Sequence, residues 1–281
     1  MKSDLDQLLE EQQADALWVT GPAQHNPAMV YLTGGGHMTQ ADAIKPHGKP
    51  ITLCHAPMER EEAGRTGLQT LNYSKFPIKD RLQLAEGDRL TAHALLYKQI
   101  FEEIGLTCGR ILVYGKSDVG KHHALLTRLS ELLPELSFVG DLDDTVLLQA
   151  MATKETDEIE RIRQMGKTVL TVVSRVAEFL TGHQVVNEVL TKPDGTPLCV
   201  GDVKGLINLW LAELGAENPE DTIFAIGRDA GVPHSSGTPA DPLRLGQTIV
   251  FDIFPCEKGG GYFYDFTRTW CLGFAPEPAR A

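Results

Sequence analysis

The stretch that decides the fold is Ile249-Val-Phe-Asp-Ile-Phe-Pro255, followed closely by Gly259-Gly-Gly-Tyr-Phe-Tyr-Asp-Phe-Thr-Arg-Thr-Trp270. Each part contains an apolar, aromatic-rich run that is typical of a β-strand, and each run carries one aspartate, Asp252 or Asp265. Between the runs lie Pro255 and three consecutive glycines, which favour a turn. We therefore interpret the segment as a β-hairpin with an aspartate on each strand.

A hairpin centred between Lys258 and Gly259 places Asp252 directly opposite Asp265, since the numbers of each opposed pair then sum to 517. Directly opposed side chains have Cβ atoms about 4.5–5.5 Å apart. Two carboxylates this close in apolar strands are unfavourable unless a cation lies between them, and hard divalent cations prefer carboxylate oxygens. The pattern indicates a site for one or two metal ions. The alternatives are a proton shared by the two carboxyls, or a slipped register in which one aspartate satisfies a turn.

The two runs resemble the paired-aspartate signature of the pita-bread metallopeptidases, which include Xaa-Pro aminopeptidases, prolidases and methionine aminopeptidases. The resemblance implies that Asp252 and Asp265, as a pair, bind and bridge two metal ions. Gly231-Val-Pro-His-Ser-Ser-Gly237 resembles the family's histidine loop, which implies that His234 lies beside the substrate and is not a metal ligand. For the carboxylate-rich site we expect two Mn²⁺ ions, with Co²⁺, Zn²⁺ or Fe²⁺ as alternatives.

The resemblance also implies ligands that this sequence does not contain. In the family a histidine and two glutamates from the second half of the catalytic domain complete the metal pair, and that half begins after the aspartate hairpin. The present sequence ends at Ala281, shortly after Trp270. We therefore expect only the first half of the catalytic domain, weak metal affinity and no activity for the chain alone. For the parent protein we expect an exopeptidase of the Xaa-Pro aminopeptidase or prolidase type that acts on peptides.

The pattern along the chain predicts two domains. Residues 1–152 alternate between helix and strand patterns, which indicates an α/β layer domain and resembles the creatinase-like N-terminal domain of the family. Residues 153–281 resemble the first half of an α+β pita-bread catalytic domain, and Lys154-Glu-Thr-Asp-Glu-Ile-Glu160 resembles the start of its first helix. The expected helices are Ser3–Ala14, Leu90–Ile104, Asp118–Leu133, Thr156–Gly182 and Asp202–Leu214, and the expected strands include Ala16–Val19, Met29–Thr33, Ala43–Ile44, Ile51–Cys54, Arg110–Tyr114 and Ile223–Ile226.

Composition restricts the partners and the compartment. The net charge of −12 argues against a nucleic-acid or anionic membrane surface as partner. Five widely spaced cysteines without a Cys-x-x-Cys motif indicate reduced thiols in the cytoplasm. The N-terminus has no apolar signal region, and no apolar run of about 18 residues occurs. We expect a cytoplasmic protein whose full-length form is a homodimer.

Two other functions remain as alternatives. A creatinase-type amidinohydrolase would share both domains but work without metal, and the aspartate pair argues against it. A pita-bread protein without peptidase activity could bind peptides or proteins. Among other candidate groups, we interpret His122-His123 as surface residues and Asp141-Leu-Asp-Asp144 as a helix cap.

Overall fold

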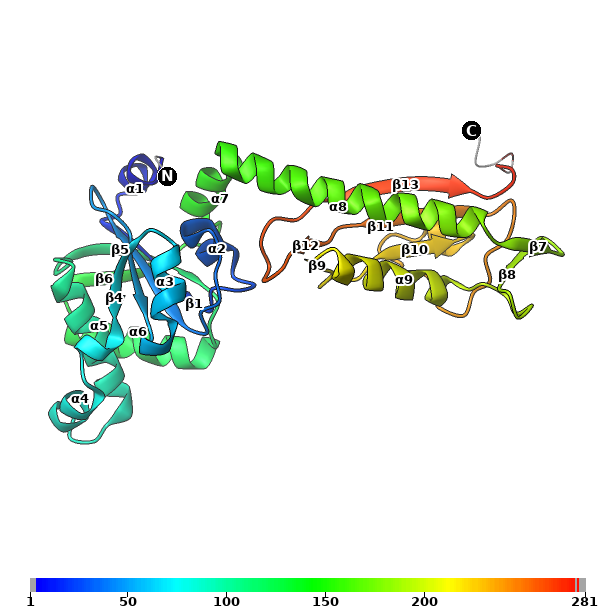
Figure 1. The fold of residues 1–281 in the computed structure, drawn as a ribbon. Coiled ribbons are helices and arrows are strands. Elements are labelled where there is room, and N and C mark those ends of the chain that lie inside the picture. The colour runs from blue at the N-terminus through cyan, green and yellow to red at the C-terminus, as the bar shows by residue number, and fades with distance from the viewer. Residues whose placement is uncertain (1–3, 276, 278–281) are drawn as a thin grey trace. The chain divides into compact units, whose positions relative to one another are not determined.

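The structure is a computed structural model that describes residues 4–275 and 277. The chain divides into two compact units, residues 1–155 and 156–281 (Figure 1). The sequence placed the boundary after residue 152. The difference arises because the last helix of the first unit ends at Ala152 and a three-residue connection follows before the next helix begins at Thr156.

The first unit is built on a six-stranded mixed sheet in the order β4-β3-β2-β1-β5-β6. β1 runs parallel to β5 and antiparallel to β2, β5 runs parallel to β6, and β2 and β3 form an antiparallel hairpin. The strands are β1 (Ala16–Gly21), β2 (Ala41–Pro46), β3 (Thr52–His55), β4 (Gln69–Asn72), β5 (Gly109–Gly115) and β6 (Leu136–Gly140).

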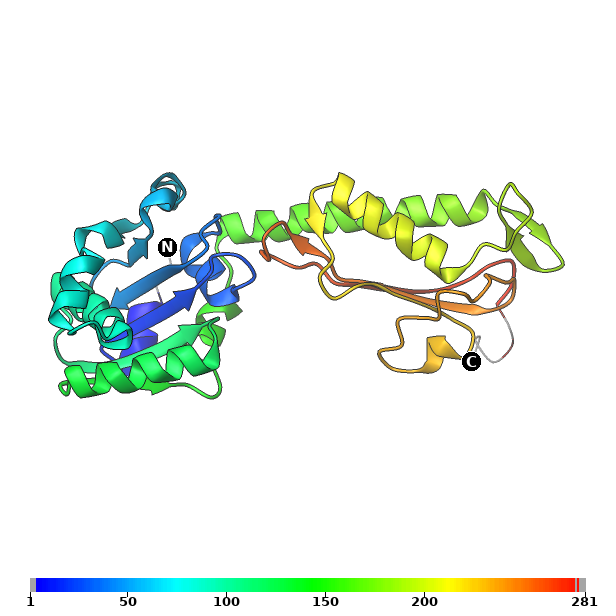
Figure 2. The same cartoon turned by 90° about the horizontal axis from the view of Figure 1, so that it is seen from below.

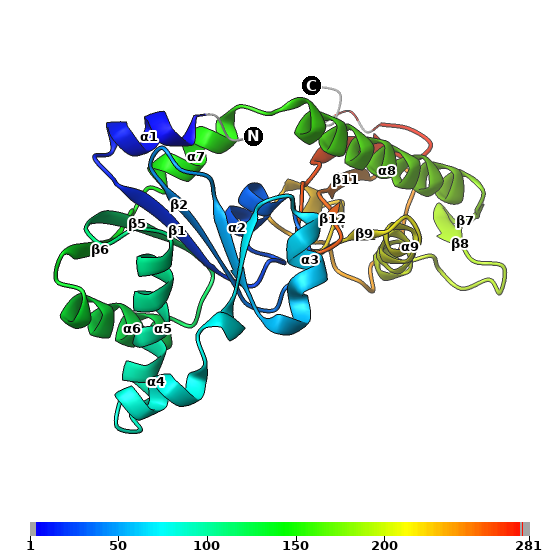
Figure 3. The same ribbon diagram turned by 60° about the vertical axis from the view of Figure 1, so that its left-hand side comes forward.

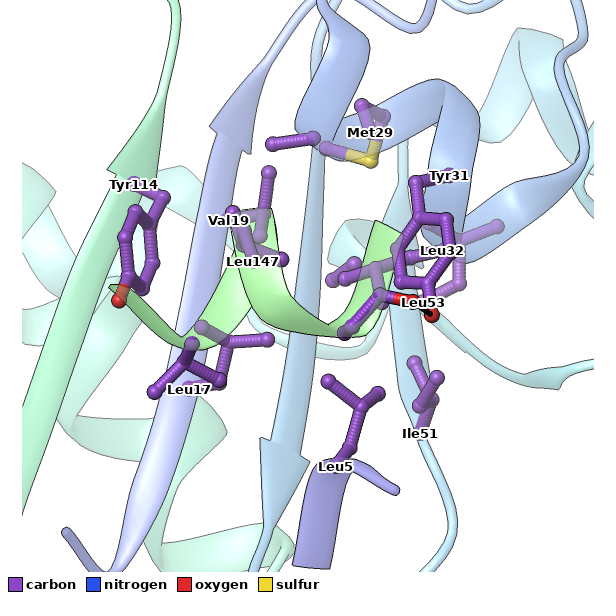
Figure 4. Packing of buried hydrophobic residues seen from close by; sticks show 14 of the residues in the cluster. Leu5, Leu17, Val19, Met29, Tyr31, Leu32, Ile51, Leu53, Tyr114 and Leu147 are labelled. Carbon is purple, nitrogen blue, oxygen red and sulfur yellow. Dashed lines mark hydrogen bonds between the residues drawn. The ribbon is translucent and has the colours of Figure 1, made fainter. Parts of the chain in front are cut away.

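Helices cover both faces of this sheet (Figure 3), so the central strand β1 is buried along its whole length. Successive side chains of a strand point to opposite faces. Leu17 and Val19 therefore enter one core, shown in Figure 4, while Ala16 and Trp18 enter the other. The first core includes residues of the helices α1 (Leu5–Glu11), α2 (Pro27–Thr33), α3 (Arg60–Arg65) and α7 (Thr145–Ala152). The second core includes residues of α5 (Arg89–Glu103) and α6 (Val119–Leu132). The helix α4 (Ile78–Leu84) contacts α5.

The strand predicted at Met29–Thr33 is wrong, because these residues form helix α2. The Asn26 side chain caps the helix by accepting a hydrogen bond from the Met29 N–H at 3.5 Å, and Pro27 occupies the first turn, where a proline loses no helical bond. Gly34 follows at the C-cap. These start and stop signals outweighed the β-propensity of a short apolar run. The predicted cap Ser3 lies outside the described residues.

Other local predictions for this unit are confirmed. The hairpin of β2 and β3 and the helices α5 and α6 fall within one to two residues of their expected bounds. Asp141 accepts a hydrogen bond from the Thr145 N–H at 2.6 Å at the start of α7, as a capping carboxylate does.

The second unit packs two helices on one side of an antiparallel sheet (Figure 2). The long helix α8 (Thr156–Thr181) buries Met165, Val169, Val172, Val176 and Leu180, whose spacing of three or four residues forms one apolar stripe. The second helix is α9 (Val200–Glu213). The sheet contains β10 (Ile223–Ile226), β11 (Thr248–Ile253) and β13 (Phe266–Cys271). Two short strand pairs lie outside this sheet: β7 (Gln184–Val186) with β8 (Val189–Thr191), and β9 (Ala216–Glu217) with β12 (Cys256–Glu257).

Candidate metal site

Asp252 lies on β11, the central strand of the second unit's sheet. The odd-numbered residues of this strand, Ile249, Phe251 and Ile253, are buried in the core that α8 and α9 cover. Because side chains alternate along a strand, Asp252 points to the opposite face of the sheet, where it is half-buried. The sequence thus sets one acidic side chain on the side of the sheet away from the helices.

The register differs from the predicted one by two residues. Asp252 is paired with Thr267, and Asp265 lies one residue before the start of β13. The predicted direct opposition of the two aspartates is therefore wrong. The turn is centred between Gly259 and Gly260, both with positive φ (87° and 77°), instead of between Lys258 and Gly259. Glycine adopts this backbone conformation at no steric cost, so the glycine pair takes the tip of the turn.

A two-residue shift keeps both aspartates on one face, because the side-chain period of a strand is two. The carboxyls remain neighbours: burial, then the negative charge of Asp252 and a hydrogen bond with it, raise the pKa of Asp265. Asp252 has a second partner, since Thr267 Oγ1 donates to its Oδ1 at 2.5 Å. The Asp252 carboxyl is therefore held by both Thr267 and Asp265.

The two carboxylates fit a hard divalent cation in kind, because they are oxygen donors and their mutual repulsion would be relieved by a cation. Two side chains supply only some of the ligands that such a cation needs. Within residues 4–275 and 277, no group of three or more His, Cys, Asp or Glu side chains is arranged to hold a metal ion. Two aspartates would thus leave most of a six-ligand shell to water or to other donors.

His234 lies in the loop between β10 and β11, is exposed, and has a left-handed backbone with φ of 61°. The end of this loop runs along β10, where the Phe224 N–H donates to the Ser236 carbonyl. Gly237 permits the approach, because a Cβ there would lie 2.2 Å from the Phe224 carbonyl oxygen. In the part of the chain that the structure describes, no hydrogen bond or ion pair joins His234 to Asp252 or Asp265.

Sequence reasoning missed a contact that holds the hairpin turn. The Arg161 guanidinium on α8 binds both carboxylate oxygens of Glu257, at 3.0 and 2.6 Å. The Glu257 carboxylate also accepts from the Tyr262 N–H. Burial raises the pKa of Glu257, but the hydrogen bonds and the positive charge of Arg161 outweigh it and lower the pKa below the usual 4.5. Residues 96 positions apart leave no local signal for such a pair.

We expect Arg161→Met to lower the free energy of unfolding of the second unit by about 1–3 kcal/mol at neutral pH, because the partly buried Glu257 loses its paired charge. The lowered pKa means that this stabilisation is present above the usual glutamate pKa and is lost as the pH falls through the lowered value. Glu257→Gln should therefore remove that part of the acid sensitivity. Urea denaturation at about pH 7 and about pH 3 measures both effects.

Arg163→Met is the matched control, because Arg163 lies on the same helix and pairs with Glu160 while both side chains are exposed. It should change the stability by about 0.5 kcal/mol or less. Equal effects of the two arginine substitutions would contradict a special role for the Glu257 pair.

Part of the chain matches the sequence model of a known protein family. Residues 160–281 match the sequence model of metallopeptidase family M24. An uncharacterized peptidase of Staphylococcus saprophyticus is 24% identical over 285 aligned residues, which cover 96% of this chain and 66% of the relative. An uncharacterized peptidase of Staphylococcus aureus is 25% identical and is covered to 64% of its length. The chain thus spans about two thirds of the length of the relatives it matches.

Solved structures show the same fold. The prolidase from Pyrococcus furiosus superposes with a TM-score of 0.66 at 19% identity, covering 98% of this chain and 67% of that one. The Xaa-Pro dipeptidase from Bacillus anthracis gives a TM-score of 0.68 at 14% identity, with 99% and 66% covered. The X-Pro aminopeptidase from Thermotoga maritima gives 0.64 at 17%, with 99% and 67% covered. The predicted fold is confirmed by this likeness.

None of the described helices is long and apolar enough to span a bilayer. All five cysteines lie in the described part of the chain, and each is a free thiol. Residues 160–281 match the sequence model of metallopeptidase family M24, and the chain has the fold of the prolidase and X-Pro aminopeptidase structures.

Proposed function

We propose that this chain belongs to a metal-dependent exopeptidase that cleaves Xaa-Pro peptides, in the manner of an Xaa-Pro aminopeptidase or prolidase. The observation that carries the proposal is the contact between Asp252 and Asp265 on the open face of the sheet. Two carboxylates held together without a cation raise the free energy of the site, so a cation would stabilise it. The fold shared with prolidases supports the choice of substrate.

Asp252 and Asp265 would hold two divalent ions, and we propose Mn²⁺ because both donors are hard oxygen ligands. Bound divalent ions polarise a carbonyl and lower the pKa of water, which is the chemistry that peptide hydrolysis requires. Thr267 would help to fix the orientation of the Asp252 carboxylate through its hydrogen bond. Such supporting hydrogen bonds fix the geometry of a ligand before the metal binds.

We assign His234 to the substrate and not to the metal. Its loop is hydrogen-bonded to β10, which pairs with β11, the strand that carries Asp252, and this connection supports the assignment. An exposed imidazole can donate a hydrogen bond to the carbonyl of a bound peptide. His234→Ala should therefore lower turnover without lowering the metal content of the protein.

The number of donors gives a direct test. We expect the 281-residue chain alone to bind Mn²⁺ weakly and to show no Xaa-Pro peptidase activity, since the described residues bring only two carboxylates together. A longer protein that contains this chain, of the length of the relatives, should hydrolyse Xaa-Pro peptides when loaded with Mn²⁺ and lose the activity in a chelator. Peptide cleavage followed by chromatography, together with metal analysis, measures both. Metal-independent hydrolysis, or no cleavage with Mn²⁺, Co²⁺, Zn²⁺ or Fe²⁺, would refute the proposal.

We further propose that the natural protein is a homodimer in the cytoplasm. The five free thiols support a reducing compartment, where cysteines remain unpaired. The acidic net charge of −12 agrees with a peptide substrate in place of a nucleic acid. Light scattering of the natural protein tests the assembly, and a monomer at micromolar concentration would contradict it.

A further inference from the structure

A buried arginine in the first unit has no acidic partner. Arg81 on α4 is 7% exposed, and its guanidinium donates to the carbonyls of Ala92 (2.9 Å) and Phe76 (3.3 Å). Within the described residues it forms no ion pair, and burial lowers the pKa of the group. A guanidinium has five N–H donors, so donors remain after these two bonds. Buried charges in proteins are normally paired, which makes this one a candidate for an external anion.

Arg81 lines a hollow of about 1290 Å³ that lies within the first unit. Arg89 and Lys121 line the same hollow, and no acidic residue belongs to its described lining. Asp80, which precedes Arg81, is exposed and lies outside the described lining. Asp88 and Asp118, which lie near Arg89 and Lys121 in the sequence, accept hydrogen bonds as the caps of α5 and α6. Three cations thus belong to the described lining, although the chain has a net charge of −12. The hollow therefore favours an anion.

A buried acid, Asp42, accepts a hydrogen bond from the lining residue Tyr97. Asp42 is fully buried and accepts hydrogen bonds from Trp18 Nε1 at 2.8 Å, from Tyr97 at 3.2 Å and from Tyr73. Tyr97 covers it and itself lines the hollow. Asp42 is thus fixed by three donors below the surface, and it is not a cause of the change in the pKa of Arg81.

The hollow lies where an α/β sheet is expected to bind small molecules. Its lining includes Thr20, at the carboxyl end of β1, and Ser117, just after the carboxyl end of the parallel strand β5. The chain then passes to α2 on one face of the sheet and to α6 on the other (Figure 3). Ligands of open α/β sheets bind in the crevice at such a point, where successive connections diverge.

Part of the lining of the hollow is apolar. Leu82, Leu90, Leu96 and Leu125 contribute to it, from α4, α5 and α6. Leu82 and Leu90 are only half-buried, so a small inorganic anion would leave their apolar surface uncovered. A ligand with an acidic group and a hydrocarbon body would satisfy both the cations and the leucines.

We propose that this hollow binds an amphipathic organic anion, with its acidic group on Arg81, Arg89 and Lys121 and its apolar body against the leucines. This function is independent of peptide hydrolysis, because every residue that carries it lies in the first unit. Binding would stabilise that unit whether or not metal is present in the second.

The test uses octanoate as the probe, with calorimetric titration of the full 281-residue chain. Octanoate should bind at least about tenfold more tightly than acetate, which lacks the apolar body, and than octyltrimethylammonium, which has the opposite charge. Arg81→Met, and the double substitution Arg89→Gln with Lys121→Gln, should each weaken octanoate binding about tenfold or more through the loss of charge-assisted hydrogen bonds.

Lys79→Gln is the matched control, because Lys79 lies on the same helix as Arg81, is exposed and does not line the hollow. It should leave octanoate affinity unchanged. Should Arg81→Met fail to fold, the double variant decides, since Arg89 and Lys121 are exposed. Equal binding of octanoate and octyltrimethylammonium, no binding of octanoate, or an unaltered affinity in the double variant would each overturn the proposal.

Discussion

Asp265→Asn in the natural protein should abolish Xaa-Pro hydrolysis. The substitution keeps the size of the side chain but removes one of the two carboxylates that lie in contact. A metal ion supplies several kcal/mol of transition-state stabilisation, and each 1.36 kcal/mol is tenfold in rate, so we expect a loss of about 10³-fold or more in kcat/KM. Metal analysis after dialysis should show less than the wild-type content.

Thr267→Val tests whether the orientation of the Asp252 carboxylate matters apart from its role as a metal ligand. It removes the hydrogen bond to Asp252 but no ligand, and the loss of a supporting hydrogen bond typically costs about 10–100-fold in metal affinity or activity. Thr269→Val is the control, because Thr269 lies two residues further along the same face of β13 and is exposed. Wild-type turnover by Asp265→Asn, or equal effects of the two threonine substitutions, would contradict the assigned site.

Much of this site could be predicted from the sequence, because the relevant signals are local and periodic. The apolar run around Asp252 predicts that this residue lies on a strand, and the three glycines predict the turn. Asp252 and Asp265 share one face of the sheet although the predicted register was wrong, because a shift of two residues leaves every side chain on the same face. The register itself depended on which glycines adopt positive φ, and three adjacent glycines gave no basis for choosing between them.

What could not be predicted depends on contacts between distant residues. The strand expected at Met29–Thr33 became a helix because capping and tertiary packing overruled the propensity of a short apolar run. The hollow around Arg81 is formed by α4, α5 and α6 together, and nothing adjacent to Arg81 in the sequence reveals that the side chain is buried without an acid. The interpretation of His122-His123 as surface residues was partly wrong, since the His122 ring lies 5.7 Å from that of Trp18 and lines this hollow.

The second substitution with a large expected effect, Phe251→Ala, concerns the stability of the second unit. Phe251→Ala should lower the free energy of unfolding of the second unit by about 3–5 kcal/mol, because Phe251 is 1% exposed and packs against Phe224 and Trp270, with ring centroids 5.4 and 5.3 Å away. Val250→Ala is the control: this neighbour lies on the open face, is half-buried, and should cost about 1 kcal/mol or less. Denaturation followed by tryptophan fluorescence resolves the units, since Trp18 reports the first and Trp210 and Trp270 report the second.

If the two units fold independently, Phe251→Ala should move only the transition of the second unit. The first unit has its own two cores on either side of its sheet, so its transition should stay where it is in the wild type. A single transition that shifts as a whole would mean that the units stabilise one another and unfold together. In that case octanoate bound in the first unit would also protect the second, and the same titration would reveal the coupling as a rise in both midpoints.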